Sequence, residues 1–252
     1  MYVEHALARF ADASKAVAPT DMPAPTLQAL FSNQPVEKFD CGAALFWEGD
    51  DATHVFEVLE GVLRIFRILG DGRRVITGFI YPGDLVGVSL KKRYLYTAEA
   101  ITPTKVRRFT RMRFETEINE SPELRPQLFA RLCDEMAAAQ DQMVLLARKN
   151  AEERVASFLL MLARRLCQDA ALCPEIELPM TRLDMADYLG LTIETVSRTM
   201  TKLFNRKIIA PSGRHAIIIR NMKELATIAG DDDEDFRPTI HANVHQAVWP
   251  HA

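Results

Sequence analysis

Three polar side chains, Glu194, Ser197 and Arg198, stand within five residues of one another. A carboxylate accepts a hydrogen bond from cytosine N4, a guanidinium binds guanine O6 and N7, and a small hydroxyl approaches either base type or a thymine methyl group. The same Glu–Arg spacing is also an ordinary ion pair on a helix surface, and a glutamate suits the first turn of any helix. The three residues therefore have the chemistry to read bases, and the secondary structure around them decides whether they can reach a base edge.

The residues around this set have the spacing of two helices joined by a tight turn. Within residues 181–204, the small Ala186 allows the two helices to approach and Gly190 permits the turn between them. The β-branched Val196 fills the space between the helices. A helix-turn-helix places the first turns of its second helix in the major groove of DNA. The spacing therefore predicts a helix-turn-helix in which Glu194, Ser197 and Arg198 face outward.

Capping residues and a buried face support the same two helices. Thr181 with Asp184 three residues later predicts a capping box for the first helix. Thr192 predicts the cap of the second helix. Apolar residues at steps of four and three predict the buried face of the second helix, which consists of Val196, Met200 and Leu203.

The net charge of −3 hides an uneven distribution. Residues 181–230 hold eight basic side chains against four acidic ones, a balance of +4, whereas residues 231–252 carry −4. A basic segment favours contact with phosphate groups, which adds affinity but little sequence information. We expect DNA-backbone contacts from seven residues, namely Arg182, Thr192, Thr195, Lys202, Arg206, Lys207 and Arg214.

A long helix is predicted within residues 121–150, which hold no glycine. Apolar residues follow one another at steps of three and four over nearly three heptads, and they are Phe129, Leu132, Met136, Ala139, Met143 and Leu146. Such a stripe is either the face of a helix packed on its own domain or the seam between two identical chains. The regular 3/4 spacing favours the dimer seam.

The region before this helix has a different pattern. Short apolar runs are separated by turn residues about every ten positions, including Gly70-Asp71-Gly72 and Pro82-Gly83-Asp84. This spacing is typical of an all-β barrel or sandwich. The chain therefore predicts an α+β protein with a flexible leader (1–25), a β domain (26–120), a dimerisation helix (121–150), a DNA-binding domain (151–230) and an acidic disordered tail (231–252).

The chain resembles the CRP/FNR family of bacterial transcription regulators. The resemblance covers about residues 40–228, including Leu45-Phe46-Trp47-Glu48-Gly49-Asp50, and the string 189–198 is similar to the FNR/FixK-like branch. It implies a double-stranded β-roll that resembles cyclic-nucleotide-binding domains, a dimerisation helix and a winged helix-turn-helix. It also implies a homodimer whose Glu194, Ser197 and Arg198 read a TTGAT-N4-ATCAA-like palindrome. The implied role is that of an activator acting with RNA polymerase in a low-oxygen or redox-linked response.

The resemblance also allows each family signal to be tested on the residues. Family members that bind cyclic nucleotides carry Gly-Glu for the ribose and an arginine for the cyclic phosphate, whereas this chain has Val88 after Gly87 and Tyr96 at the later position. A buried phosphate without a guanidinium has no partner for its charge. We therefore expect no cyclic-nucleotide binding.

A metal cofactor has similarly little support. An iron–sulfur cluster of the FNR type needs four thiolates, and Cys41 is the only cysteine before Cys133. Cys133, Cys167 and Cys173 are interpreted as structural, and His241 with His245 lies in the predicted tail. Haem stays open, since His5 and His54 are available, although each is more typical of a surface histidine. No other cofactor or metal site is predicted.

Two other classes of function compete with DNA reading. A β-roll signalling module that responds to a small molecule or haem is the alternative, and the basic recognition helix counts against it. An enzyme has little support, because no nucleophile set, phosphate-binding loop or zinc spacing rises above chance. No stretch of 18 apolar residues or signal peptide is evident, so we expect a cytoplasmic protein without membrane contact.

Overall fold

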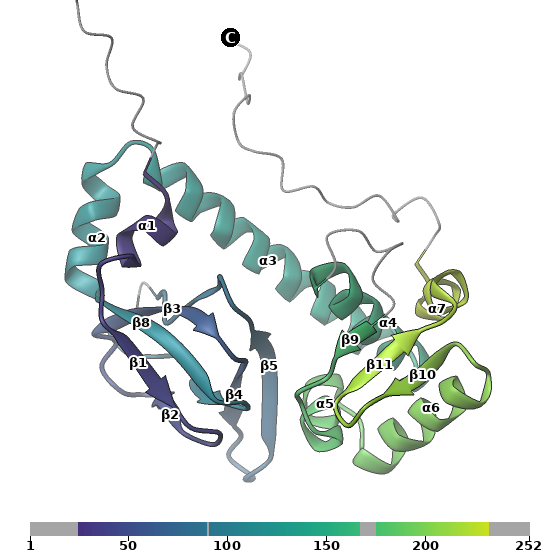
Figure 1. Cartoon of the computed structure of the whole chain (residues 1–252). Coiled ribbons are helices and arrows are strands. Elements are labelled where there is room, and N and C mark those ends of the chain that lie inside the picture. Colours follow the sequence, from purple (N-terminus) through teal and green to yellow (C-terminus); the bar gives the residue numbers. More distant parts are fainter. Residues whose placement is uncertain (1–24, 90, 167–174, 232–252) are drawn as a thin grey trace, which may run out of the picture.

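The computed structural model describes residues 25–89, 91–166 and 175–231. The predicted leader and tail therefore lie almost wholly outside the described residues. The same holds for Cys167 and Cys173 and for the histidines at 5, 241 and 245. Two β-sheets form the N-terminal half, helices follow, and a small helical domain with a third sheet forms the C-terminal half (Figure 1).

The N-terminal domain consists of two four-stranded antiparallel sheets, ordered β1-β8-β3-β6 and β2-β7-β4-β5. Apolar side chains from both sheets form a shared core that includes Val58, Leu63 and Val106. The strands are β1 (Val36–Phe39), β2 (Ala44–Phe46), β3 (His54–Glu60), β4 (Leu63–Ile68), β5 (Arg74–Ile80), β6 (Leu85–Val86), β7 (Thr97–Ala100) and β8 (Thr104–Thr110). The predicted β-roll is confirmed.

Two of its turns show why glycine stands where it does. Gly72, between β4 and β5, has φ +85°, a conformation that favours glycine. Gly61, between β3 and β4, has φ +84°, and a Cβ there would lie 2.4 Å from the carbonyl oxygen of Pro103. A side chain at Gly61 would therefore push apart two turns of the β-roll.

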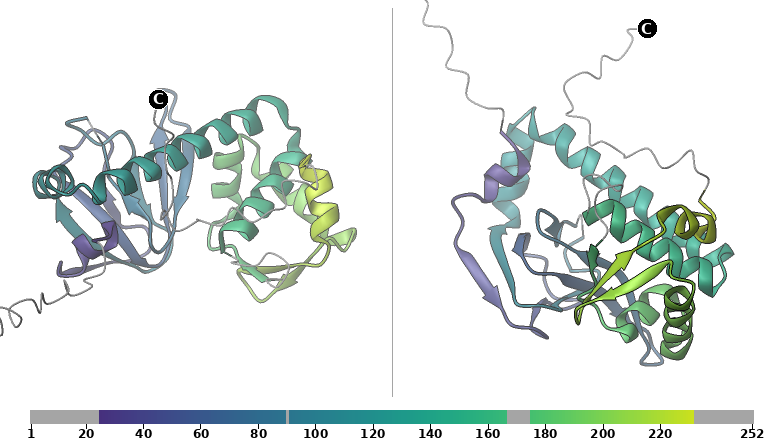
Figure 2. Two further views of the ribbon diagram at one scale, coloured as in Figure 1. Left: turned by 90° about the horizontal axis from the view of Figure 1, so that it is seen from above. Right: turned by 45° about the vertical axis from the view of Figure 1, so that its right-hand side comes forward.

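Three helices flank the β-roll: α1 (Leu27–Phe31), α2 (Arg111–Glu120) and α3 (Leu124–Arg148). Phe31 is fully buried and contacts Phe109 and Phe114 at ring-centroid distances of 5.6 and 6.2 Å. This aromatic cluster fixes α1 and α2 against β8. The long helix α3 then passes from the β-roll to the C-terminal domain (Figure 2).

The C-terminal domain combines four helices with a three-stranded sheet of order β10-β11-β9. Its elements are α4 (Ala151–Leu166), β9 (Glu175–Glu177), α5 (Arg182–Leu189), α6 (Ile193–Asn205), β10 (Ile209–Ser212), β11 (Ala216–Ile219) and α7 (Met222–Ala229). Strands β10 and β11 pair antiparallel and form the wing that the family resemblance implies. In the described parts of the chain, no helix is long and apolar enough to span a membrane.

The two domains share one continuous apolar core. Phe79 of β5 lies 6.0 Å from the ring of Phe158 on α4 and 5.5 Å from the ring of Tyr188 on α5. All three side chains are at least nine-tenths buried. Burial on this scale stabilises one relative placement of the domains, because separating them would expose large aromatic surfaces to water.

Buried tyrosines predict a loss of stability at high pH. Burial raises the pKa of Tyr96 and of Tyr188 to about 12, whereas an unfolded tyrosine titrates near 10. The unfolded state therefore releases protons first, and the free energy of unfolding falls between about pH 10 and 12, by up to about 1.4 kcal/mol per pH unit for each tyrosine. Urea unfolding of wild type and Tyr96→Phe from pH 9 to 11 should show a shallower decline for the variant. Equal slopes would contradict this prediction.

Candidate nucleic-acid interface

Helices α5 and α6 form the predicted helix-turn-helix. The hydroxyl of Thr181 accepts from the backbone N–H of Asp184 at 3.1 Å, and the Asp184 carboxylate accepts from the N–H of Thr181 at 3.0 Å. Gly190 ends α5 with φ +61°, and the N–H of Leu191 then donates to the carbonyl of Ala186. Both the capping box and the glycine turn are confirmed.

Helix α6 presents the predicted polar set to solvent. Thr192 caps the helix by accepting from the N–H of Thr195 at 3.2 Å. The apolar face of the helix is buried, at Val196, Met200 and Leu203. Glu194, Ser197 and Arg198 are exposed in the first two turns, as the sequence predicts. A rigid, capped helix therefore offers a carboxylate, a hydroxyl and a guanidinium at its N-terminal end.

The ionisation of Glu194 suits hydrogen-bond acceptance. A hydrogen bond from its own backbone N–H lowers the pKa of this carboxyl, and the Thr192 hydroxyl and the charge of Arg198 act in the same direction. An ionised carboxylate is only an acceptor. Glu194 thus has the charge state that a contact with an amino group on a base edge requires.

Five of the seven predicted backbone contacts have three different environments. Lys207 and Arg214 are exposed, with Lys207 in a left-handed conformation after α6 and Arg214 in the wing turn. Thr192 and Thr195 share a hydroxyl–hydroxyl contact of 3.1 Å at the start of α6. Arg182 is half-buried, and burial lowers the pKa of its guanidinium. Its Nη1 donates to the Met185 sulfur.

Lys202 and Arg206 already have acidic partners within the chain. Both contact the carboxylate of Glu152 on α4, and Arg206 also pairs with Glu224 at 2.8 Å. Sequence reasoning missed these pairs, because Glu152 lies 50 or more residues away. Phosphate groups would have to compete with these carboxylates for the two cations.

The apolar stripe on α3 is unpartnered within the described part of the chain. Phe129 is 70 % exposed, Met136 59 % and Met143 63 %, and Leu132, Ala139 and Leu146 are exposed as well. The first of the two interpretations, packing of this stripe on its own domain, is therefore wrong. An exposed stripe of this kind is typical of a surface that another protein covers.

The β-roll is filled by aromatic side chains near the position where the resemblance implies a nucleotide phosphate. The backbone N–H of Gly87 donates to the hydroxyl of Tyr96 at 3.3 Å. Phe46 stacks on Tyr94 with ring centroids 3.7 Å apart and lies 5.7 Å from the ring of Tyr96. These contacts place a phenol where the family pattern has a guanidinium.

A surface cleft of about 390 Å³ lies on the same domain, and Glu37, His54 and Arg108 are among its lining residues. Arg108 pairs with Glu37 at 3.0 Å, and the ring of His54 contacts the Thr53 hydroxyl at 2.9 Å. Burial lowers the pKa of His54, and the charge of Arg108 adds to this effect.

Within the described ranges, no three His, Cys, Asp or Glu side chains gather where a metal ion could bind.

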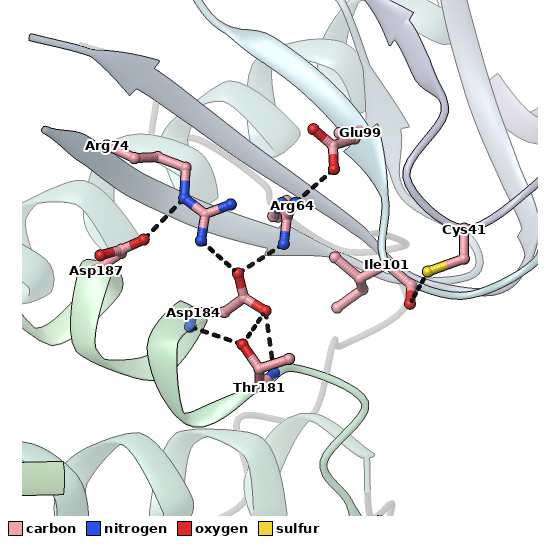
Figure 3. Close-up of polar contacts among 8 residues, drawn as sticks. All are labelled: Cys41, Arg64, Arg74, Glu99, Ile101, Thr181, Asp184 and Asp187. Carbon is pink, nitrogen blue, oxygen red and sulfur yellow. Dashed lines mark hydrogen bonds and ion pairs between the residues drawn. The ribbon is translucent and has the colours of Figure 1, made fainter. Parts of the chain in front are cut away.

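Contacts between the domains include ion pairs that sequence reasoning did not predict. We name Arg64, Arg74, Glu99, Asp184 and Asp187 the interdomain ion cluster (Figure 3). Two arginines of the β4–β5 hairpin face carboxylates in the first and second turns of α5. The one available signal was the presence of arginines in the otherwise apolar strands of this hairpin, and an arginine does not identify its partner.

Asp84 makes a second charged connection. Its carboxylate accepts from the N–H of Tyr81 at 2.9 Å and contacts Arg131 of α3 and Arg165 of α4. The guanidinium of Arg165 also lies 4.9 Å from the centre of the Tyr81 ring. The turn that contains Asp84 thus joins the β-roll to both long helices.

Comparisons with known proteins agree with this architecture. Residues 36–121 match a family model described as a cyclic nucleotide-binding domain, and residues 153–228 match a Crp-like helix-turn-helix domain. The nitrogen fixation regulation protein FixK of Bradyrhizobium diazoefficiens is 45 % identical over 68 % of this chain and 73 % of that protein. The transcriptional activatory protein AadR of Rhodopseudomonas palustris is 43 % identical over 73 % of this chain and 77 % of its own length.

A solved structure agrees with the fold. The structure of FixK2 from Bradyrhizobium japonicum has a TM-score of 0.73 and 36 % identity, covering 79 % of this chain and 98 % of that one. Both halves of the chain, the β-roll and the helix-turn-helix, are therefore accounted for by one family. The chain belongs to the CRP/FNR family of DNA-binding transcription regulators, on its FNR/FixK-like branch.

Proposed function

We propose that two copies of this chain bind a TTGAT-N4-ATCAA-like palindrome and activate transcription by RNA polymerase. The observation that carries the proposal is the joint exposure of Glu194, Ser197 and Arg198 on one capped helix. Each subunit inserts α6 into one half-site, where the three side chains read base edges. Thr192, Thr195, Lys207 and Arg214 supply contacts to the DNA backbone.

The exposed stripe on α3 supports the dimer. Met136 and Met143 are both more than half exposed in the single chain, and burying such side chains against a second copy stabilises the pair by the hydrophobic effect. A two-fold dimer also matches the symmetry of a palindrome, because each half-site then meets an identical helix. The domain limits given above, with a dimerisation helix between β-roll and DNA-binding domain, belong to this proposal.

The proposed dimer acts without a cyclic nucleotide. Tyr96 supports this view, since its hydroxyl lies against the Gly87 N–H where the family pattern has a phosphate-binding arginine. The FNR/FixK-like branch suggests a low-oxygen or redox-linked response. The cytoplasm is the proposed location, because the bacterial chromosome and RNA polymerase are there.

Binding of the full-length protein to labelled DNA tests this proposal. We expect binding to the TTGAT-N4-ATCAA duplex to exceed binding to a scrambled duplex by at least about 1,000-fold. The affinity for both duplexes should fall steeply between 50 and 200 mM salt. Equal affinity for the two duplexes would contradict the proposal. Saturable binding of cyclic AMP or haem without DNA binding would instead support a ligand-responsive β-roll module.

A further inference from the structure

The interdomain ion cluster ties the sheet of the β-roll to the first and second turns of α5. Arg74 of β5 donates from Nε to Asp187 at 2.8 Å and from Nη2 to Asp184 at 2.9 Å. Arg64 of β4 donates to the same Asp184 oxygen at 2.7 Å and to Glu99 at 2.5 Å. Figure 3 shows the two guanidinium groups side by side above the N-terminal end of α5. One hairpin thus holds two acidic residues of the helix-turn-helix.

These contacts are shielded from solvent. The side chain of Asp184 is 2 % exposed, and those of Arg74 and Asp187 are 22 and 20 % exposed. Ion pairs with little exposure are screened much less by salt than surface pairs. Asp184 also accepts hydrogen bonds from Thr181 through its other oxygen. Asp184 therefore has two roles: it caps the N-terminus of α5, and it forms the ion pairs with Arg64 and Arg74 of the β-roll.

The opposite end of α5 is connected to the dimerisation helix. Arg154 donates to the carbonyls of Leu189 on α5 and Leu146 on α3, each at 2.9 Å. Gln142 of α3 donates to the carbonyl of Tyr188 at 2.9 Å. Helix α5 is thus held at both ends, which defines its position relative to the exposed stripe on α3.

This docked arrangement leaves the reading face of α6 free. Glu194, Ser197 and Arg198 are exposed while the ion cluster is formed. In a two-fold dimer, the distance between the two copies of α6 follows from the placement of α6 relative to α3 in each subunit. Half-site spacing on DNA reports this distance directly.

We propose that the Arg74–Asp187 ion pair positions the recognition helix and thereby sets the spacing between half-sites that the dimer accepts. Arg74 and Asp187 are positioning residues and do not touch DNA. The proposal rests on the dimeric DNA binding proposed above. It adds a specificity determinant that lies outside the reading helix and is shared between two domains.

The test measures binding of full-length dimers to palindromes with spacers of three, four, five and six base pairs, and to a single half-site. The variants are Arg74→Glu, Asp187→Arg and the double variant that reverses the pair. Arg73→Glu is the matched control, because Arg73 lies next to Arg74 but pairs with Asp71, and its own side chain is 75 % exposed. Circular dichroism and thermal unfolding verify that each variant is folded.

Wild type should prefer the four-base-pair spacer. In each single variant, the ratio of affinity for this spacer to affinity for the other spacers should fall roughly tenfold, while the half-site affinity stays unchanged. The double variant should regain part of the preference, because it restores the pair with position 187 but not the contact with Asp184, and Arg73→Glu should retain the preference. If the ion pair only stabilised the fold, the single variants would also lose affinity for a half-site. Unchanged half-site affinity, together with partial recovery of the spacing preference in the charge-reversed variant, therefore distinguishes positioning from stability. An Arg74→Glu dimer with the wild-type spacing preference, or a double variant no better than either single variant, overturns the proposal. Wild type that binds the palindrome no more tightly than a single half-site overturns the proposed dimeric function as well.

Discussion

Replacing Arg198 with alanine will weaken binding to the palindrome by about 1–3 kcal/mol for each guanine that the guanidinium binds. This side chain is exposed in the second turn of α6, with Glu194 one turn before it. The alanine variant cannot form the two hydrogen bonds to guanine O6 and N7. Affinity for palindromes with another base pair at that position should change much less, so that the variant discriminates less as well as binding less tightly.

Fluorescence anisotropy with duplexes that carry each of the four base pairs in turn at every half-site position provides the measurement. Lys207→Ala is the control, because this exposed cation follows α6 and is expected to contact phosphate. It should weaken binding to all sequences equally and reduce the salt slope by about 1. If Arg198→Ala bound all the duplexes with wild-type ratios, the base-reading role of Arg198 would be wrong.

Introducing charge into the stripe on α3 will separate the dimer. In Leu132→Glu combined with Met136→Glu, each subunit places two carboxylates on a surface that the partner covers in the proposed dimer. Burying unpaired charges is strongly unfavourable. The protein should sediment as a monomer, and its palindrome affinity should fall roughly 100- to 10,000-fold, toward that of a single half-site.

Ala137→Glu is the matched control for this variant. Ala137 is exposed on the same helix but lies outside the 3/4 spacing of the stripe, so the added charge remains in water. This variant should stay dimeric and bind the palindrome as wild type does. Analytical ultracentrifugation at micromolar concentration separates the two outcomes, and a dimeric Leu132→Glu/Met136→Glu protein would refute the proposed seam.

Local patterns were sufficient to predict the elements of the DNA-binding domain. Thr181 and Asp184 predicted a capping box, Gly190 predicted the turn, and Val196 marked the buried face of α6. All of these are confirmed by the structure. They could be predicted because caps, glycine turns and amphipathic faces depend on residues only three to six positions apart. The all-β character of the N-terminal domain was predicted for the same reason, from turn residues between short apolar runs, whereas the β-roll itself was implied by the family resemblance.

The environment of individual charges was not predictable in this way. Arg182 was expected at the DNA backbone but is half-buried beside Met185. Lys202 and Arg206 meet Glu152, which lies on another helix. Whether a charged side chain faces water, a carboxylate or a sulfur atom depends on how the helices pack. Periodicity along one helix does not contain this information.

The sequence by itself determined which face of α6 is polar, which face of α3 is apolar, where α5 begins and ends and where α6 begins, because these properties follow from neighbouring residues. Only the tertiary structure decided that Arg64 and Arg74 meet Asp184 and Asp187, more than 100 residues away. Those contacts form because the aromatic core around Phe79 brings the two domains together. The position of the reading helix relative to the stripe on α3 is thus a property of the domain interface rather than of any local segment.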